Sequence, residues 1–190
     1  MSFVARRLAA GAGLALGHSL RSRCDEQLVH VPSSMNLKLA GVIAEDALAE
    51  AHHVNLHPLA VVVLDAGGHD VLALREDGCG VMRVGIARGK AYACLAMGMP
   101  SRQIRDRLKD RPTFVGALSD VSGGRFVPVP GGVLVVDEES GVAIGAVGVS
   151  GDTSDKDEMV AIVAINKQDG VAANPAAPPA TWARSSLGPH

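Results

Sequence analysis

Apolar residues recur between positions 36 and 54 at the spacing that places them on one face of a helix. The stripe consists of Leu37, Ala40, Ala44, Ala47, Leu48 and Ala51. Ser34 or Asn36 is a suitable N-cap, because its side-chain oxygen can accept a hydrogen bond from a free backbone N–H of the first turn. Pro58 follows the expected end at Val54. The pattern predicts an amphipathic helix at the start of the folded domain.

A different pattern follows, in which apolar residues are continuous and many are β-branched. Residues 59–65 have this character, which is typical of a buried strand. The tight turn at 66–69 and the residues 71–75 predict that the chain returns as the second strand of a hairpin. Residues 80–98 are apolar on nearly every side of a predicted helix, in which Gly85 and Gly89 would let another backbone approach closely.

The second half of the domain is expected to hold short strands between two helices. Residues 101–109 predict a short, highly charged helix, and the proline and glycines of residues 110–124 predict a loop. Three strands are predicted, at residues 125–129, 132–136 and 142–149. A closing helix is predicted for residues 154–167, with Asp152 or Thr153 as its cap and carboxylates in its first turns, where they suit the helix dipole.

Hairpins dominate this order of elements and no βαβ alternation is present, which favours an antiparallel sheet. We expect an α/β (α+β) domain with a five-stranded antiparallel sheet flanked by helices, similar to profilin-like or roadblock-like folds. We assign it to residues 35–168, between an N-terminal arm at 1–34 and a Pro/Ala-rich C-terminal tail at 169–190. The tail has no periodic apolar pattern, so we expect it to be mobile or to lie on a partner subunit.

The composition narrows the classes of partner. Hydrophobic residues make up 47% of the 190 residues and charged residues 20%, as in a soluble globular protein. The formal net charge is −2, so no excess of positive charge attracts nucleic acid. No apolar run reaches the roughly 18 residues that a membrane-spanning helix needs. We therefore expect neither nucleic acid nor a membrane as a partner.

The first residues and the cysteines indicate in which cellular compartment the protein works. Arg6 and Arg7 precede a short apolar run at residues 8–16, a weak twin-arginine-like pattern, but no Ala-x-Ala cleavage site follows. The cysteines are 3 in number, far apart and without a CxxC pair, which argues against a disulfide framework. We expect a cytoplasmic protein whose N-terminal segment makes oligomer contacts, with export as the alternative.

Several segments come in the order and spacing of a known family. They are VVVLDAGGH at 61–69, REDG at 75–78, GKAYA at 89–93, PGGV at 130–133, GAVGVSG at 145–151 and the pair Asp157-Glu158. Together they make the chain resemble the heme-binding GlcG/HbpS group (DUF336). This resemblance implies an α/β subunit that forms homo-oligomers, from dimers to octamers, with links to heme and to small-molecule catabolism. The chain departs from the group at Glu76, where many relatives have Met, and in its long terminal arms.

Lys90 is the most informative single residue. It shares a face of the predicted helix with four apolar residues, Met82, Ile86, Ala93 and Met97. A lysine in apolar surroundings needs a partner. It therefore either forms a salt bridge within the fold or across a dimer, or faces a pocket and receives a carboxylate such as a heme propionate. In the second case Arg75 and Arg83 could join it, because guanidinium groups bind carboxylates through two hydrogen bonds.

Three acidic residues are candidate partners for that cation. Asp77 follows a predicted strand, although it also suits a turn with Gly78. Asp157 and Glu158 come early in the closing helix, where they also suit the helix dipole. If the protein is an enzyme, Lys90, Asp77 and Asp157 are the candidate catalytic residues.

Glycine-rich segments offer backbone groups to a ligand. Residues 148–151 lead from a strand to a helix start, where free N–H groups can bind an anion. Gly131 and Gly132 would let a flat ligand or another subunit lie against the backbone, unless they simply form a turn. The candidate ligand-binding residues are Arg75, Lys90, Gly131, Gly132, Gly148, Ser150 and Glu158.

A heme iron would take an imidazole, thiolate or thioether as its axial ligand. The candidates are His52, His53, Met82 and Cys79, with His53 first because it is expected on an outward helix face. A solvated surface histidine is the alternative for each imidazole. No CxxCH motif for covalent attachment is present.

Three functions remain open. The first is a binding or accessory protein that holds heme, or a similar carboxylated molecule, at a subunit interface. The second is an enzyme acting on a small carboxylate. The third is a structural or adaptor subunit.

Overall fold

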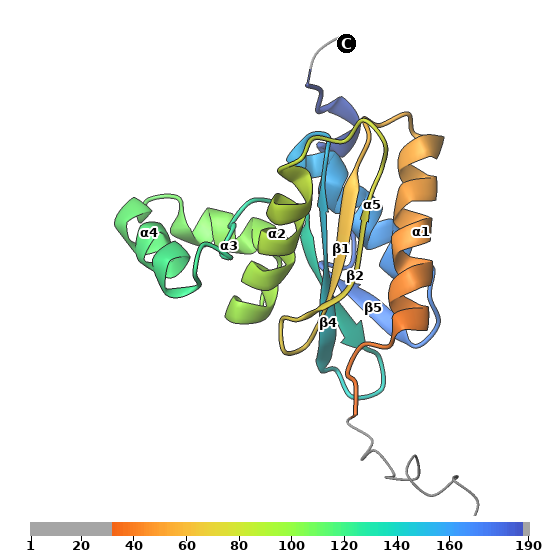
Figure 1. Ribbon diagram of the computed structural model, residues 1–190, viewed down its shortest axis with the longest axis horizontal. Coiled ribbons are helices and arrows are strands. Elements are labelled where there is room, and N and C mark those ends of the chain that lie inside the picture. Colours follow the sequence, from red (N-terminus) through yellow and green to blue (C-terminus); the bar gives the residue numbers. More distant parts are fainter. Residues whose placement is uncertain (1–31, 188–190) are drawn as a thin grey trace, which may run out of the picture. The chain divides into compact units, whose positions relative to one another are not determined.

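The computed structural model describes residues 32–187, and these form helices on both faces of an antiparallel sheet (Figure 1). The strands are β1 (Ala60–Asp65), β2 (Asp70–Arg75), β3 (Gly132–Asp137), β4 (Ala143–Ser150) and β5 (Val171–Asn174). Their spatial order is β2-β1-β4-β3-β5, and every adjacent pair is antiparallel. The predicted five-stranded antiparallel sheet with flanking helices is confirmed.

The helices divide between the two faces of the sheet. They are α1 (Leu37–His53), α2 (Arg83–Met97), α3 (Ser101–Leu108), α4 (Pro112–Val121), α5 (Ser154–Asn166) and the short 3-10 helix η1 (Trp182–Arg184). Alternate residues of β1 serve the two layers: Val61 and Val63 pack with α1 and α5, whereas Val62 and Leu64 pack with α2. The strand is apolar from Ala60 to Leu64 because both of its faces are covered there.

Local sequence signals explain several element ends. The side chain of Asn36 accepts a hydrogen bond of 2.8 Å from the N–H of Leu39, which confirms it as the N-cap of α1. The hairpin of β1 and β2 forms as predicted, with Gly68 in the turn at φ +78°. Ser101 lies at the start of α3, but its buried hydroxyl accepts from the N–H of Gly132 and donates to the carbonyl of that residue.

Two segments between α3 and β3 differ from the prediction. Residues 112–121, within the expected loop, form α4, with Pro112 in the first turn, where a missing N–H costs nothing. Residues 125–129 form no strand, since Val127 packs onto Gly89 of α2 and donates its N–H to the carbonyl of that glycine.

The C-terminal residues also differ from the prediction. Residues 169–190 are expected to form a tail, but β5 lies among them, pairs with β3 and supplies the fifth strand. Val171 and Ala173 are buried, and Trp182 packs against the core formed with α1 and α5. The tail is therefore part of its own domain as far as residue 187.

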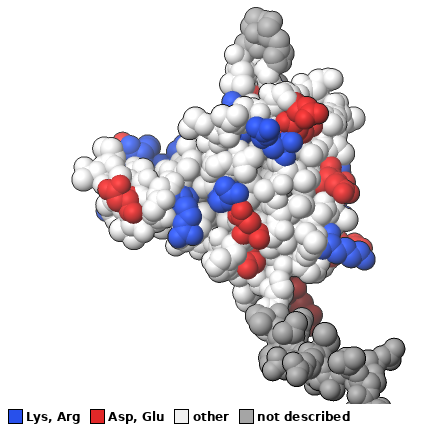
Figure 2. Space-filling model, viewed as in Figure 1, with Lys and Arg blue, Asp and Glu red and all other residues white. Residues whose placement is uncertain are grey.

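The described residues begin after most of the N-terminal arm. The N-terminal arm and its twin-arginine-like pattern lie almost entirely outside the described residues. Within residues 32–187 no helix combines the length and apolar character needed to cross a membrane. The predicted cytoplasmic location stays a prediction. On the face shown in Figure 2, charged side chains form small separate groups, and no broad patch of one sign is visible.

Candidate functional site

Lys90 is a residue of α2, and its side chain lies inside the fold, directed toward the start of α5. Its side chain is 2% exposed, and its Nζ donates to Asp157 Oδ2 and to the carbonyl of Val149, each at 2.8 Å. Burial lowers the pKa of Lys90 and raises the pKa of Asp157, and the charge of each partner opposes the shift of the other. Of the two interpretations of Lys90, a salt bridge or a ligand-binding cation, the structure agrees with the first, because Lys90 pairs with Asp157 of the same chain.

The glycines expected beside a ligand are instead in contact with the chain itself. A Cβ added to Gly148 would lie 1.9 Å from the carbonyl oxygen of Ala87 in α2. A Cβ on Gly132 would lie 2.4 Å from the carbonyl oxygen of Lys90, and one on Gly131 2.7 Å from Lys90 Nζ. These positions let α2 approach the sheet, so no space is left there for a flat ligand.

The expected anion position at the start of α5 holds the chain's own carboxylates. Asp157 Oδ1 accepts from the N–H of Asp152, whose carboxylate accepts from the N–H groups of His57 and Thr153. The hydroxyl of Ser150 is buried and accepts from Arg83 Nη1 at 3.3 Å. An external anion has no free donor at this helix start among these groups.

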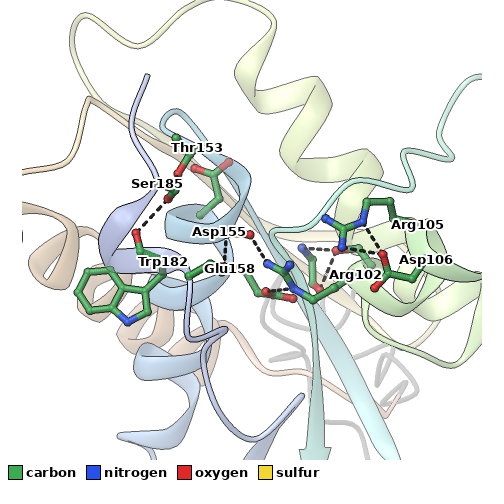
Figure 3. Close-up of polar contacts among 12 residues, drawn as sticks. Arg102, Arg105, Asp106, Thr153, Asp155, Glu158, Trp182 and Ser185 are labelled. Carbon is green, nitrogen blue, oxygen red and sulfur yellow. Dashed lines mark hydrogen bonds and ion pairs between the residues drawn. The ribbon is translucent and has the colours of Figure 1, made fainter. Parts of the chain in front are cut away.

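Glu158 pairs with a cation that sequence reasoning did not single out (Figure 3). Arg102 of α3 donates from Nε to Glu158 Oε2 at 2.7 Å and from Nη2 to Asp155 Oδ1 at 2.5 Å. Burial raises the pKa of Glu158, against the hydrogen bond from Arg102. Burial also acts to raise the pKa of Asp155, but hydrogen bonds from Thr181 and Arg102 hold it below its usual value. Four other cations lie within residues 102–111, so no local signal marked Arg102.

A second group of polar side chains lies at the N-terminal end of α2, on the connection from β2. We call residues 75–83 the 75–83 surface. Arg75 is exposed at the end of β2, and Arg83 is half-buried at the start of α2. Neither guanidinium group has a carboxylate partner within residues 32–187. Both are available to an anion from outside the chain.

The same surface exposes apolar side chains next to these cations. Val81 is 85% exposed and Met82 73% exposed. Met82 is also the N-cap of α2, where it makes no side-chain capping bond, and the first turn holds no acidic residue. The positive end of the helix dipole is therefore not neutralised by a capping side chain. Apolar contact and positive charge are combined on this surface.

Cys79 lies within the surface but is nearly buried, at 7% exposure. Burial raises the pKa of its thiol, although the charges of Arg83 and Arg75 act to lower it. A thiol that keeps its proton is a poor nucleophile and a poor metal ligand. Asp77 is exposed in the turn before Gly78, which adopts φ +82°, and within residues 32–187 the carboxylate that pairs with Lys90 is that of Asp157, not that of Asp77. The interpretation of Asp77 as a turn residue fits this placement.

His52 is held against the 75–83 surface, whereas His53 is not. His52 Nε2 lies 2.5 Å from Glu76 Oε1, and Glu76 Oε2 accepts from the N–H of Leu59 at 2.6 Å. His53 is 80% exposed, and its nearest carboxylate is Glu50, at 3.9 Å. Within the described part of the chain, no group of three or more His, Cys, Asp or Glu residues could hold a metal ion. The preference for His53 as axial ligand stays a prediction, and of the two histidines it is His52 that contacts the 75–83 surface.

Comparisons with known proteins agree with the resemblance seen in the sequence. A family model described as "Haem degrading protein HbpS-like" matches residues 35–166. An uncharacterized 15.0 kDa protein from the dhaT-dhaS intergenic region of Citrobacter freundii is 31% identical over 134 residues, which cover 70% of this chain and 92% of that protein.

Three solved structures share the fold. The protein ORFY of Klebsiella pneumoniae is 26% identical, with a TM-score of 0.64 and coverage of 73% and 92% of the two chains. A double mutant of Streptomyces reticuli HbpS is 25% identical, with a TM-score of 0.62 and coverage of 84% and 98%. A complex of PduOC with heme is 22% identical, with a TM-score of 0.65 and coverage of 74% and 98%, and shows likeness of fold alone. This chain belongs to the HbpS-like family.

Proposed function

We propose that this protein is a homo-oligomeric, heme-binding accessory protein of small-molecule catabolism, and that heme binds at the 75–83 surface. The observation that carries the proposal is the pair Arg75 and Arg83, which have no carboxylate partner within residues 32–187 and lie on the same connection as the exposed Val81 and Met82. Heme is a flat apolar molecule with two carboxylates. Such a ligand needs apolar contact and cations side by side.

The residues of this surface fit the needs of heme. Arg75 and Arg83 would hold the propionates, while Val81 and Met82 would contact the ring. Bound heme supplies an iron atom that takes an imidazole or thioether ligand. His52 is the better placed imidazole, because Glu76 contacts one ring nitrogen and orients the ring, as carboxylates hydrogen-bonded to metal-binding histidines do. Met82 is the alternative ligand. The HbpS-like family and a structural neighbour, the complex of PduOC with heme, support heme as the ligand.

The enzyme alternative has less support. It makes Lys90 a base or a substrate clamp, with Asp77 or Asp157 as its acid partner. Lys90 is 2% exposed and both of its close polar contacts belong to the chain. A group that does this chemistry must come within hydrogen-bond reach of the substrate. Lys90 and Asp157 therefore serve the fold in this proposal.

Titration of the full chain with hemin tests the proposal. We expect a saturable Soret shift, and each of Arg75→Gln and Arg83→Gln should weaken binding by about tenfold, or ~1.4 kcal/mol. His52→Gln should change the Soret position, which reports the axial ligand, and His69→Gln is the matched control. His69 is also exposed and also lies near a carboxylate, Asp65, but in the β1–β2 turn.

The outcomes separate the candidates. If His53→Gln alone alters the spectrum, the axial ligand is His53 and our placement of heme is wrong. The absence of a saturable shift with the wild-type protein would reject heme binding altogether. Light scattering on the same samples gives the number of subunits per bound heme and tests the predicted homo-oligomer.

A further inference from the structure

The helix α4 lies beyond α3, away from the sheet (Figure 1). None of its ten residues is buried, although its sequence, PTFVGALSDV, is largely apolar. Val115 and Leu118 make partial contacts with the small cluster of Ile104, Leu108 and Phe126. A helix this short is marginal without tertiary packing. A molecule bound to the exposed apolar side of α4 would therefore stabilise this helix.

A groove of about 270 Å³ runs along this helix, between α3, α4 and the segment at 125–129. It is lined by Leu108, Pro112, Val115 and Pro128, which are apolar, and by Arg105 and Lys109. Its volume exceeds the roughly 150 Å³ of a cavity that holds benzene and falls just below the roughly 300 Å³ at which drug-sized pockets begin. The groove therefore suits a small apolar molecule.

The two cations that line the groove favour a bound molecule with a negative charge. Lys109 is exposed and has no carboxylate partner within residues 32–187. Within residues 32–187 the one ion pair of Arg105 is with Asp106, its exposed neighbour in α3, at 2.6 Å, although its charge also acts on Asp155 and Glu158. Asp110 is the other acidic residue of this stretch, and Arg111 stacks over Phe114 at 4.5 Å and adds a further positive charge. Arg102, earlier in α3, is already neutralised by Asp155 and Glu158.

We propose that this groove binds an apolar monocarboxylate, a small acid with an alkyl or aryl body, whose carboxylate is held by Arg105 and Lys109. The apolar lining accepts the body of the acid, and the two cations favour its ionised form over the corresponding alcohol or amine. None of the groove residues belongs to the 75–83 surface, so this proposal does not depend on heme binding.

Isothermal titration of the full chain with octanoate tests the groove. We expect saturable binding with a Kd on the order of 0.1–1 mM, as suits a ligand of about ten heavy atoms. Under the same conditions 1-octanol and octylammonium should bind at least about tenfold more weakly. Lys109→Gln and Arg105→Gln should each weaken octanoate binding by about three- to tenfold. Arg107→Gln is the matched control, since this exposed arginine of α3 does not line the groove.

Three results would overturn the proposal. The first is the absence of saturable octanoate binding by the wild-type protein. The second is equal loss in Arg107→Gln and Lys109→Gln, which would indicate general charge attraction. The third is a Val115→Gln variant that loses its oligomeric state in light scattering while octanoate leaves the wild type unaffected, because the groove would then be an interface between copies of the chain. Circular dichroism of each variant checks that it folds.

Discussion

The ammonium group of Lys90 is buried inside the fold, where it lies 2.8 Å from the carboxylate of Asp157. The position of Lys90 on an apolar helix face predicts that it needs a partner, and the structure supplies Asp157. The sequence could not tell whether that partner belongs to the fold or to a ligand, because 67 positions separate the two residues. The same limit applies to Arg102 and Glu158. Helical spacing identifies the face of a residue but not the element that covers it.

The buried pair of Lys90 and Asp157 should stabilise the fold only as a pair. Lys90→Met leaves a buried carboxyl group without its cation, and we expect a loss of about 3–5 kcal/mol in the free energy of unfolding. The double variant Lys90→Met, Asp157→Asn removes both charges and keeps a side-chain oxygen for the N–H of Asp152. It should be more stable than Lys90→Met alone by about 1–3 kcal/mol.

Urea denaturation of the wild type, both single variants and the double variant measures this coupling. Additive losses in the two single variants would contradict the pair, because independent residues show no coupling energy. A Lys90→Met variant as stable as the wild type would mean that the ammonium group is not held inside the fold as described.

At the scale of elements, the sequence predicts the long and strongly patterned segments. The stripe of α1 and the apolar run of β1 are recognisable because each covers a whole face of its element. The missed elements lack such a pattern: β5 has only 4 residues, and α4 begins with a proline, contains Gly116 and has no buried face. Residues 125–129 have the composition of a strand, but the contact of Val127 with Gly89 takes the place of sheet pairing.

Close packing of α2 on the sheet depends on glycines that the sequence alone assigned to a ligand. Gly148→Ala would place a Cβ where the carbonyl oxygen of Ala87 lies, and we expect it to lower the free energy of unfolding by about 1–3 kcal/mol or more. Gly116→Ala is the matched control, because this α4 position has open space around it. That change should raise stability by about 0.5–1 kcal/mol, since alanine loses less backbone entropy in a helix.

Thermal and urea unfolding of the two alanine variants measure these changes in the free energy of unfolding. A Gly148→Ala protein with wild-type stability would show that α2 can move off the sheet at little cost. In that case the backbone at residue 148 would again be open to a ligand, and its assignment to helix packing would be wrong.

At the scale of the whole domain, the C-terminal segment carries the largest difference between expectation and structure. After β5 its Pro/Ala-rich sequence has no periodic pattern, because residues 175–187 form no regular element except the short η1 and contact the rest of the domain through a few separate residues. Trp182 packs on the core, Ser185 Oγ lies 2.6 Å from Thr153 Oγ1, and Thr181 bonds to Asp155 (Figure 3). Isolated contacts of this kind leave no period for sequence analysis to detect.

Removal of residues 175–190 distinguishes a segment that belongs to its own domain from an arm that holds a partner. On the structure described, the truncated chain loses the packing of Trp182, and its free energy of unfolding should fall by about 1.5–3 kcal/mol. Trp182→Ala in the full chain should reproduce most of that loss. Removal of residues 188–190 alone is the control. An arm that lies on a partner subunit would behave differently, because its removal would lower the number of subunits in light scattering while the unfolding of dilute, dissociated protein stayed the same. The first pattern follows from contacts within one chain, and the second would return these residues to the role that their composition suggests.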